Sequence, residues 1–140
     1  MEWMILPLRR YADFSGRSRR KEYWMFTLLQ LIVYGAAAIV GGIFALIYNA
    51  TSGGSDAAGV FGIIFLVLFV IVALGLIIPN IAVTVRRFHD QDKSGWFFLL
   101  NFIPYVGGLV VLVFMFLEGT RGANRYGDDP KSPSHFDVFA

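Results

Sequence analysis

Two long apolar runs without a charged residue constrain this chain more than any other feature of its sequence. The first covers residues 25–48 (MFTLLQLIVYGAAAIVGGIFALIY) and has 24 residues; the second covers residues 58–85 (AGVFGIIFLVLFVIVALGLIIPNIAVTV) and has 28. As a helix, the shorter run extends roughly 36 Å at about 1.5 Å per residue, which exceeds a hydrocarbon core of about 30 Å. We therefore expect two transmembrane helices.

The composition agrees with an integral membrane protein. The chain is 56% hydrophobic and 16% charged, whereas soluble domains are about 25% charged. Its mean hydropathy is +0.62, and a soluble domain of 140 residues would leave a large apolar patch exposed. The net charge of +2 is divided among short segments beside the apolar runs, so anionic lipid headgroups are the expected partner and nucleic acid is not. The chain has no cysteine, which excludes disulfides and thiolate metal sites.

A third apolar stretch allows two structures. Residues 96–117 (WFFLLNFIPYVGGLVVLVFMFL) number 22 but are interrupted by Pro104, Gly107 and Gly108. The stretch can be one kinked span, or a helical hairpin of residues 96–103 and 109–117 whose halves, each about 12 Å long, are too short to cross. Both alternatives stay open at this point.

The predicted fold class is all-α, a polytopic integral membrane helical bundle in a single domain of residues 1–140. A short N-terminal helix within residues 2–14 pairs apolar side chains with arginines, as interfacial helices do. The parts of the domain are an interfacial N-terminal segment (1–24), two spans (25–48 and 58–85), the broken third segment (96–117) and a polar tail (118–140).

The distribution of basic residues predicts the orientation. Lys and Arg number six before the first span, none in residues 49–57, three in residues 86–95 and three after residue 117. Because positive segments favour the cytoplasm, we expect a cytoplasmic N-terminus and a cytoplasmic 86–95 segment. The tail is also cytoplasmic if the third stretch is re-entrant or crosses twice, which we favour, and outside if it crosses once.

The block VRRFHDQDKSGW at residues 85–96 holds the densest charge. Arg86, His89, Asp90 and Lys93 fall at i, i+3, i+4 and i+7, on one face of a helix, where Arg86 and Asp90 can pair. An ordinary charged end of a span explains this pattern. So does a lipid or partner contact through guanidinium groups. A general base at His89, oriented by Asp90, is the least favoured of the three interpretations.

Signatures of metal or catalytic chemistry are weak. Asp128 and Asp129 are adjacent carboxylates, a pattern more typical of a solvated turn than of a magnesium site. The sequence has no HExxH motif and no GxSxG motif. We therefore predict a non-enzymatic protein without catalytic residues, metal or cofactor.

A stripe of small residues lies in the first span. Ala37, Gly41 and Ala45 repeat every four residues and permit close helix packing, either within the chain or in a homo-oligomer. No Asp, Glu, Lys or Arg lies within the apolar runs, which disfavours a proton-coupled transporter.

Four motifs resemble those of a known family. They are FSGRSRRKEYWMF (14–26), PNIAVTVRRFHDQDKSGW (79–96), FIPYVGG (102–108) and GANRYGDDP (122–130). In order and spacing they are similar to the YhaH-like bacterial inner-membrane proteins, a domain of unknown function (number 805). This chain has Phe88 where leucine is expected and Phe97 where tryptophan is common. The resemblance implies a small multi-pass protein of the bacterial cytoplasmic (inner) membrane, and it supplies no reaction.

The resulting hypothesis is a cytoplasmic polar cluster that binds anionic lipid headgroups or a membrane protein partner. An oligomeric small transporter or pore, and a lipid-headgroup enzyme using His89 and Asp90, are the alternatives. The predicted lipid- or partner-binding residues are Arg17, Arg20, Trp24, Arg86, Arg87, His89, Asp90, Ser94, Trp96, Asn124 and Arg125.

Overall fold

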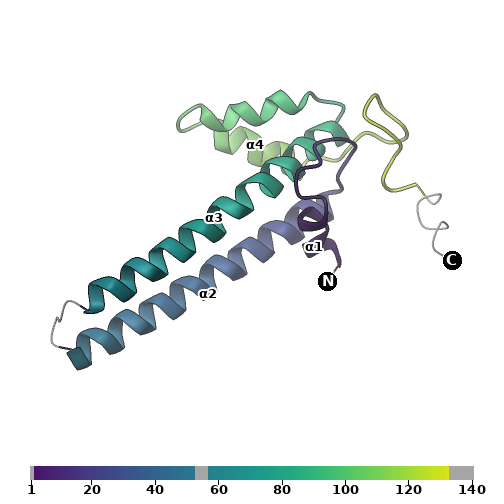
Figure 1. Cartoon of the computed structure of the whole chain (residues 1–140). Coiled ribbons are helices and arrows are strands. Elements are labelled where there is room, and N and C mark those ends of the chain that lie inside the picture. The colour runs from purple at the N-terminus through teal and green to yellow at the C-terminus, as the bar shows by residue number, and fades with distance from the viewer. Residues whose placement is uncertain (1, 53–56, 133–140) are drawn as a thin grey trace. The chain divides into compact units, whose positions relative to one another are not determined.

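The computed structural model describes residues 2–52 and 57–132, and within these ranges the chain forms helices and no strand (Figure 1). The all-α prediction is confirmed. The helices are α1 (Glu2–Arg9), α2 (Arg20–Ser52), α3 (Ala57–Asp90), the 3-10 helix η1 (Gly95–Phe102) and α4 (Gly107–Phe116).

Helices α2 and α3 contain the two long apolar runs. They have 33 and 34 residues, and each is long and apolar enough to cross a membrane. Both continue beyond the apolar runs into charged sequence, because α2 begins at Arg20 and α3 ends at Asp90. The charged ends therefore carry Arg20 and Glu22 on α2, and Arg86, Arg87 and Asp90 on α3.

The chain divides into two compact units. The polar unit consists of Met1–Thr27 and Ile78–Ala140, and the apolar unit is Leu28–Ile77. In the apolar unit, Gly41 lies so close to α3 that a Cβ atom there would approach the Phe65 ring to 2.6 Å. Gly41 of the small-residue stripe thus makes an intramolecular packing contact, while Ala37 is half-buried and Ala45 is exposed.

The third apolar stretch is a helical hairpin. Helix η1 has eight residues and α4 has ten, and a turn with Tyr105 at φ 66° reverses the chain between them (Figure 1). A Cβ atom at Gly107 would overlap the carbonyl of Leu100, so only glycine permits this close return. At about 1.5 Å per residue, α4 extends only about 15 Å. The number of membrane crossings stays a prediction.

The hairpin packs on the end of α3 and forms the core of the polar unit. Phe88, Val111 and Met115 are its buried members, and Trp24 and Phe114 pack against them. Because Val111 and Met115 lie one helical turn apart on α4, one face of α4 covers α3. This packing places the segment after α4 beside the carboxyl end of α3.

Helix α1 ends at Arg9 and lies inside the stretch of residues 2–14 where a short helix was expected. The Arg10 guanidinium pairs with Asp13 at 2.6 Å, and the Ser15 hydroxyl donates to the other Asp13 oxygen at 2.5 Å. The hydrogen bond from Ser15, together with Arg10, holds the pKa of the Asp13 carboxyl well below its usual range. Gly16, at φ 75°, then turns the chain toward α2.

Candidate functional site

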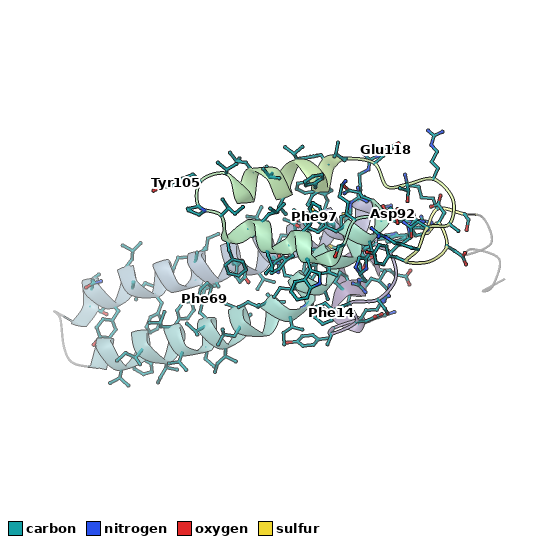
Figure 2. All side chains as sticks on the ribbon, turned by 90° about the horizontal axis from the view of Figure 1, so that it is seen from above. Phe14, Phe69, Asp92, Phe97, Tyr105 and Glu118 are labelled. Atoms are coloured by element: carbon teal, nitrogen blue, oxygen red, sulfur yellow. The ribbon has the colours of Figure 1, made fainter. Side chains whose placement is uncertain are left out.

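Five charged side chains are buried together in the polar unit, and we call them the ion network. Nitrogen and oxygen atoms gather in this region, near Asp92 and Glu118 (Figure 2). Every side chain in the network is at most 5% exposed. Since an unpaired buried charge is costly, their pairing is decisive for the fold. The members are Arg17, Glu22, Arg86, Arg87 and Asp90.

Asp90, the last residue of α3, is the centre of the network. Arg17 Nε donates to Asp90 Oδ1 at 3.0 Å, and Arg87 Nη1 donates to Oδ2. The second terminal nitrogen of Arg87 donates to the carbonyl of Leu117, just after α4. One carboxylate thus joins the loop before α2, the end of α3 and the end of α4.

Arg17 also fixes the segment that follows α4. Its Nη1 donates to the carbonyl of Gly122 at 2.6 Å, and its Nη2 donates to the carbonyl of Thr120 at 2.5 Å. The Thr120 N–H in turn donates to the backbone carbonyl of Asp90 at 2.8 Å. Between these contacts Gly119 has no room for a side chain, because a Cβ atom there would overlap the Asp90 carboxylate.

Arg86 does not pair with Asp90, although the helical spacing allows that pair. Arg86 Nη2 donates to Glu22 Oε1 at 3.1 Å, and the carbonyl of Arg86 accepts from the N–H of Ser18 at 3.1 Å. Spacing on one helix identifies residues that can pair, but Glu22 of α2 competes for Arg86. The two oxygens of Asp90 accept hydrogen bonds from Arg17 and Arg87 instead.

The predicted single helical face that includes Lys93 is not formed. Helix α3 ends at Asp90, and Asp92, at φ 56°, turns the backbone away from the helix. Lys93 therefore lies beyond the helix, with its Nζ 5.2 Å from the centre of the Phe114 ring.

Three buried guanidinium groups face two buried carboxylates, so the network carries one excess positive charge. Arg86 Nε and Nη1, and Arg87 Nε, have no hydrogen-bond partner among the described residues. Loss of either carboxylate would increase this imbalance in a region that water does not reach. The network is therefore sensitive to changes at Glu22 and Asp90.

Four of the other predicted residues lie around the network in more exposed places. Arg20 pairs with Glu118 at 2.5 Å, and Arg125 pairs with Asp92 at 3.1 Å. Trp24 packs on the Phe116 ring, with centroids 4.5 Å apart. The Asn124 side chain donates to the carbonyl of His89 at 2.9 Å.

His89 is held by backbone and ring contacts. Its Nδ1 lies 3.2 Å from the carbonyl oxygen of Gly16, and its ring stacks on Tyr126 with centroids 3.9 Å apart and an interplanar angle of 4°. The two oxygens of the neighbouring Asp90 are bound by arginines. The carbonyl of Gly16, and not Asp90, therefore orients the imidazole.

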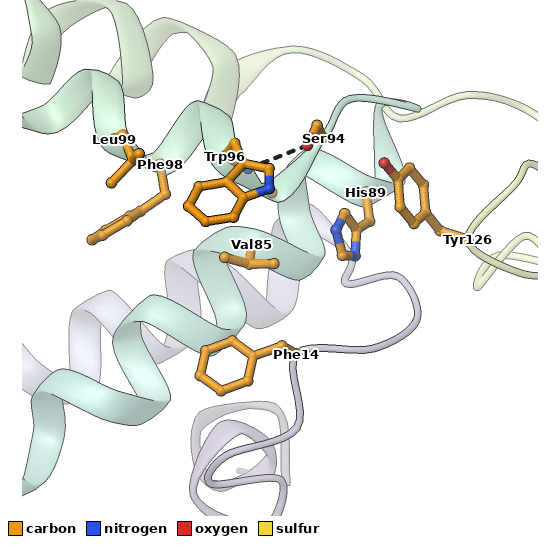
Figure 3. A pocket seen from close by; sticks show the side chains of 9 residues that line it. Phe14, Val85, His89, Ser94, Trp96, Phe98, Leu99 and Tyr126 are labelled. Atoms are coloured by element: carbon orange, nitrogen blue, oxygen red, sulfur yellow. Dashed lines mark hydrogen bonds between the residues drawn. The ribbon is translucent and has the colours of Figure 1, made fainter.

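A cavity of about 480 Å³ lies beside His89 (Figure 3), and we call it the aromatic cavity. Ser94, which accepts a hydrogen bond from the Trp96 N–H at 3.4 Å at the start of η1, stands at its edge together with Trp96. The cavity is lined by Phe14, Val85, His89, Ser94, Gly95, Trp96, Phe98, Leu99 and Tyr126.

Sequence reasoning missed several residues that the structure brings into these sites. Glu22 could have been noticed as the single acid in the basic run of residues 17–22 (RSRRKE). A buried partner for one of the arginines was therefore a reasonable expectation. Phe14 and Tyr126 stand in two of the family motifs, but nothing in those motifs places them beside His89. Gly119 and Thr120 carried no signal, because their contacts join segments far apart in the chain. Among the described residues, no group of three or more histidine or acidic side chains is arranged to hold a metal ion.

Comparison with known proteins identifies relatives over almost the whole chain. Residues 11–128 match the family model described as "Protein of unknown function (DUF805)". The chain is 43% identical over 135 residues to Inner membrane protein YhaI of Escherichia coli (strain K12), covering 96% of this chain and 100% of that protein. It is 40% identical over 131 residues to Inner membrane protein YhaH of the same strain, covering 94% and 98%. No solved structure matches the chain.

Proposed function

Because the chain belongs to the DUF805 family, and relatives along nearly its full length are named as inner membrane proteins, we propose that it is a non-enzymatic protein of the bacterial inner membrane. Its polar unit binds anionic lipid headgroups at the cytoplasmic surface. The two long apolar helices support insertion into the bilayer. The arrangement of basic side chains in the polar unit supports the lipid contact.

The burial of the ion network changes which residues we assign to this contact. Arg17, Arg86 and Arg87 are enclosed by their partners, so a headgroup in the bilayer cannot reach them without unfolding the network. Exposed cations lie in the tail and around α1, where Arg9 and Lys21 are both exposed. Of these two groups, the one around α1 also contains Trp3, and tryptophan favours the headgroup region. We therefore assign the headgroup contact to the surface formed by α1 and the start of α2.

The observation that carries the proposal is the position of the Trp3 ring close to two basic side chains. Lys21 Nζ lies 5.6 Å from the centre of its ring, and the Arg19 guanidinium lies 5.4 Å from it. Tryptophan favours the headgroup region of a bilayer, and a basic side chain near an anionic surface contributes about 1 kcal/mol. An indole beside two cations on an N-terminal helix is therefore well suited to anionic headgroups.

Removing the charges of Arg9 and Lys21 is expected to weaken the preference for anionic lipid by about 2 kcal/mol, or roughly thirtyfold. The measurement uses full-length protein in which Trp3 is the only tryptophan. Its fluorescence is quenched by brominated phosphatidylglycerol or by brominated phosphatidylcholine, and the ratio gives the lipid preference of the Trp3 region. The variant is Arg9→Gln with Lys21→Gln.

Lys131→Gln is the matched control, because Lys131 is also exposed but lies in the tail, 4.0 Å from Glu118. This control should keep the preference for phosphatidylglycerol. An equal preference for the two lipids in the unaltered protein, or no loss in the double variant, would contradict the proposal.

The orientation is tested by labelling single cysteines, since the chain has none of its own. Ala12, Ala123 and Ala50 are exposed alanines in the N-terminal loop, in the tail and at the end of α2. With an impermeant maleimide on intact spheroplasts, we expect labelling of Ala50→Cys alone. Ala12→Cys and Ala123→Cys should react only after the membrane is opened. Labelling of Ala12→Cys and Ala123→Cys from opposite sides would refute a shared cytoplasmic face.

A further inference from the structure

The aromatic cavity has the features of a ligand site that the proposed headgroup contact does not use. We propose that it binds an uncharged amphiphile of the phenol or hydroquinone class. The aromatic ring of the ligand lies among the aromatic side chains, and a ring hydroxyl donates a hydrogen bond to His89 Nε2. No redox step is part of this inference.

The lining of the cavity favours a neutral ligand. None of its nine residues is Lys, Arg, Asp or Glu, so a phosphate or carboxylate would lose its hydration without gaining a charged partner. The volume of about 480 Å³ lies within the range of small-molecule pockets, about 300–1,000 Å³. The cavity therefore differs in chemistry from the basic surface around Trp3.

His89 supplies a hydrogen-bond acceptor to this cavity. A carbonyl oxygen only accepts, so the contact of His89 Nδ1 with the Gly16 carbonyl at 3.2 Å requires the hydrogen to be on Nδ1. In the neutral ring, Nε2 then carries the lone pair and accepts from a donor. A ligand that matches this atom presents a hydroxyl group and not a bare carbonyl.

Gly95 keeps His89 Nε2 open to the cavity. A Cβ atom at Gly95 would lie 3.2 Å from Nε2 and 2.7 Å from Val85 Cγ1. The space that such a methyl group would fill is therefore the space next to the acceptor. Glycine at this position leaves room for the hydroxyl of a ligand.

The remaining walls favour a ring over an alkyl chain. Phe14, Trp96, Phe98 and Tyr126 supply four aromatic side chains, which pack favourably against another ring in offset or edge-to-face arrangements. Trp96 is 78% exposed and lies at the cavity beside Val85 (Figure 3). Its indole is placed to stack on a ligand that enters from the outside.

The test measures binding to the full-length protein in phosphatidylcholine nanodiscs, with Trp96 as the single tryptophan. Three probes are titrated under reducing conditions: a decyl-substituted hydroquinone, its dimethyl ether and decanol. We expect saturable quenching of Trp96 by the hydroquinone. The dimethyl ether should bind about tenfold more weakly, because it leaves the His89 acceptor buried without a donor. Decanol should not compete with the hydroquinone.

Two variants locate the site. Gly95→Ala fills the space beside His89 Nε2. Leu99→Phe places a larger side chain at a half-exposed position of the lining and narrows the cavity. Each variant should weaken hydroquinone binding at least tenfold. Gly62→Ala is the matched control, because a Cβ atom there meets nothing within 4 Å, and it should bind as the parent does. Circular dichroism shows whether each variant keeps its helices.

Three results would overturn the inference. Equal binding of the hydroquinone and its dimethyl ether would show that no hydrogen bond to His89 contributes to binding. Equal binding of decanol would remove the requirement for a ring. Hydroquinone binding that is unchanged in Leu99→Phe would place the ligand outside the aromatic cavity. If Gly95→Ala is folded, its binding must also be unchanged for this conclusion.

Discussion

Replacing Asp90 with asparagine is expected to lower the free energy of unfolding by about 3–5 kcal/mol, the usual cost of removing one partner from a buried ion pair. Asp90 is 3% exposed and is bound by Arg17 and Arg87. Asparagine keeps the shape of the side chain but removes the negative charge, so the network would hold three guanidinium groups against Glu22 alone. Reversible unfolding of the purified protein in mixed micelles with increasing dodecyl sulfate measures the change.

Asp92→Asn is the matched control for this prediction. Asp92 pairs with Arg125 at 3.1 Å, and their side chains are 46% and 60% exposed. Pairs in such exposed positions contribute about 0–1 kcal/mol, so this variant should unfold nearly as the parent does. Similar losses in Asp90→Asn and Asp92→Asn would show that the burial of the network does not determine its energetic importance.

The second large effect is expected at Gly119, where a single added methyl group should be strongly destabilising. In Gly119→Ala the Cβ atom would overlap the Asp90 carboxylate. That carboxylate cannot rotate away without leaving Arg17 and Arg87. Overpacking costs about 1–3 kcal/mol, and separation of the ion pairs adds to it. We expect a loss of unfolding free energy of at least about 2 kcal/mol in the same denaturation experiment.

A double-mutant cycle separates this mechanism from a general requirement for glycine. If the alanine acts by displacing the Asp90 side chain, Gly119→Ala should cost little further stability in an Asp90→Ala background, where the carboxylate is absent. Gly108→Ala, where a Cβ atom meets nothing within 4 Å, should change stability by less than about 1 kcal/mol. Additive losses in the cycle would refute the steric explanation.

The ion pairs behind these two predictions explain why the ion network did not follow from the sequence. Within α3, the spacing of Arg86 and Asp90 was compatible with a pair, and the structure instead joins Arg86 to Glu22 and Asp90 to Arg17. These partners lie 64 and 73 residues apart in the chain. Helical spacing describes only neighbours on one element, so it contains no information about which charge from a distant segment will pair with each residue.

The aromatic cavity was hidden for the same reason. His89, Ser94 and Trp96 were recognised as one block, but Phe14 and Tyr126, which complete the lining, belong to the N-terminal loop and to the tail. Their positions depend on Gly16, on the hairpin turn at Tyr105 and on the contacts of Arg17. None of these has a periodic pattern that a sequence reveals.

The sequence by itself determined the features that depend on the solvation of single segments. Two uncharged runs of 24 and 28 residues can satisfy their backbone in an apolar medium as helices, and the charged blocks must lie at their ends. Only the tertiary structure decided which charges pair, that the third stretch folds into a hairpin, and that Arg17, Arg86 and Arg87 are enclosed. Those outcomes depend on competition among partners from several segments, because a buried charge is stabilised by whichever opposite charge the folded chain brings into contact with it.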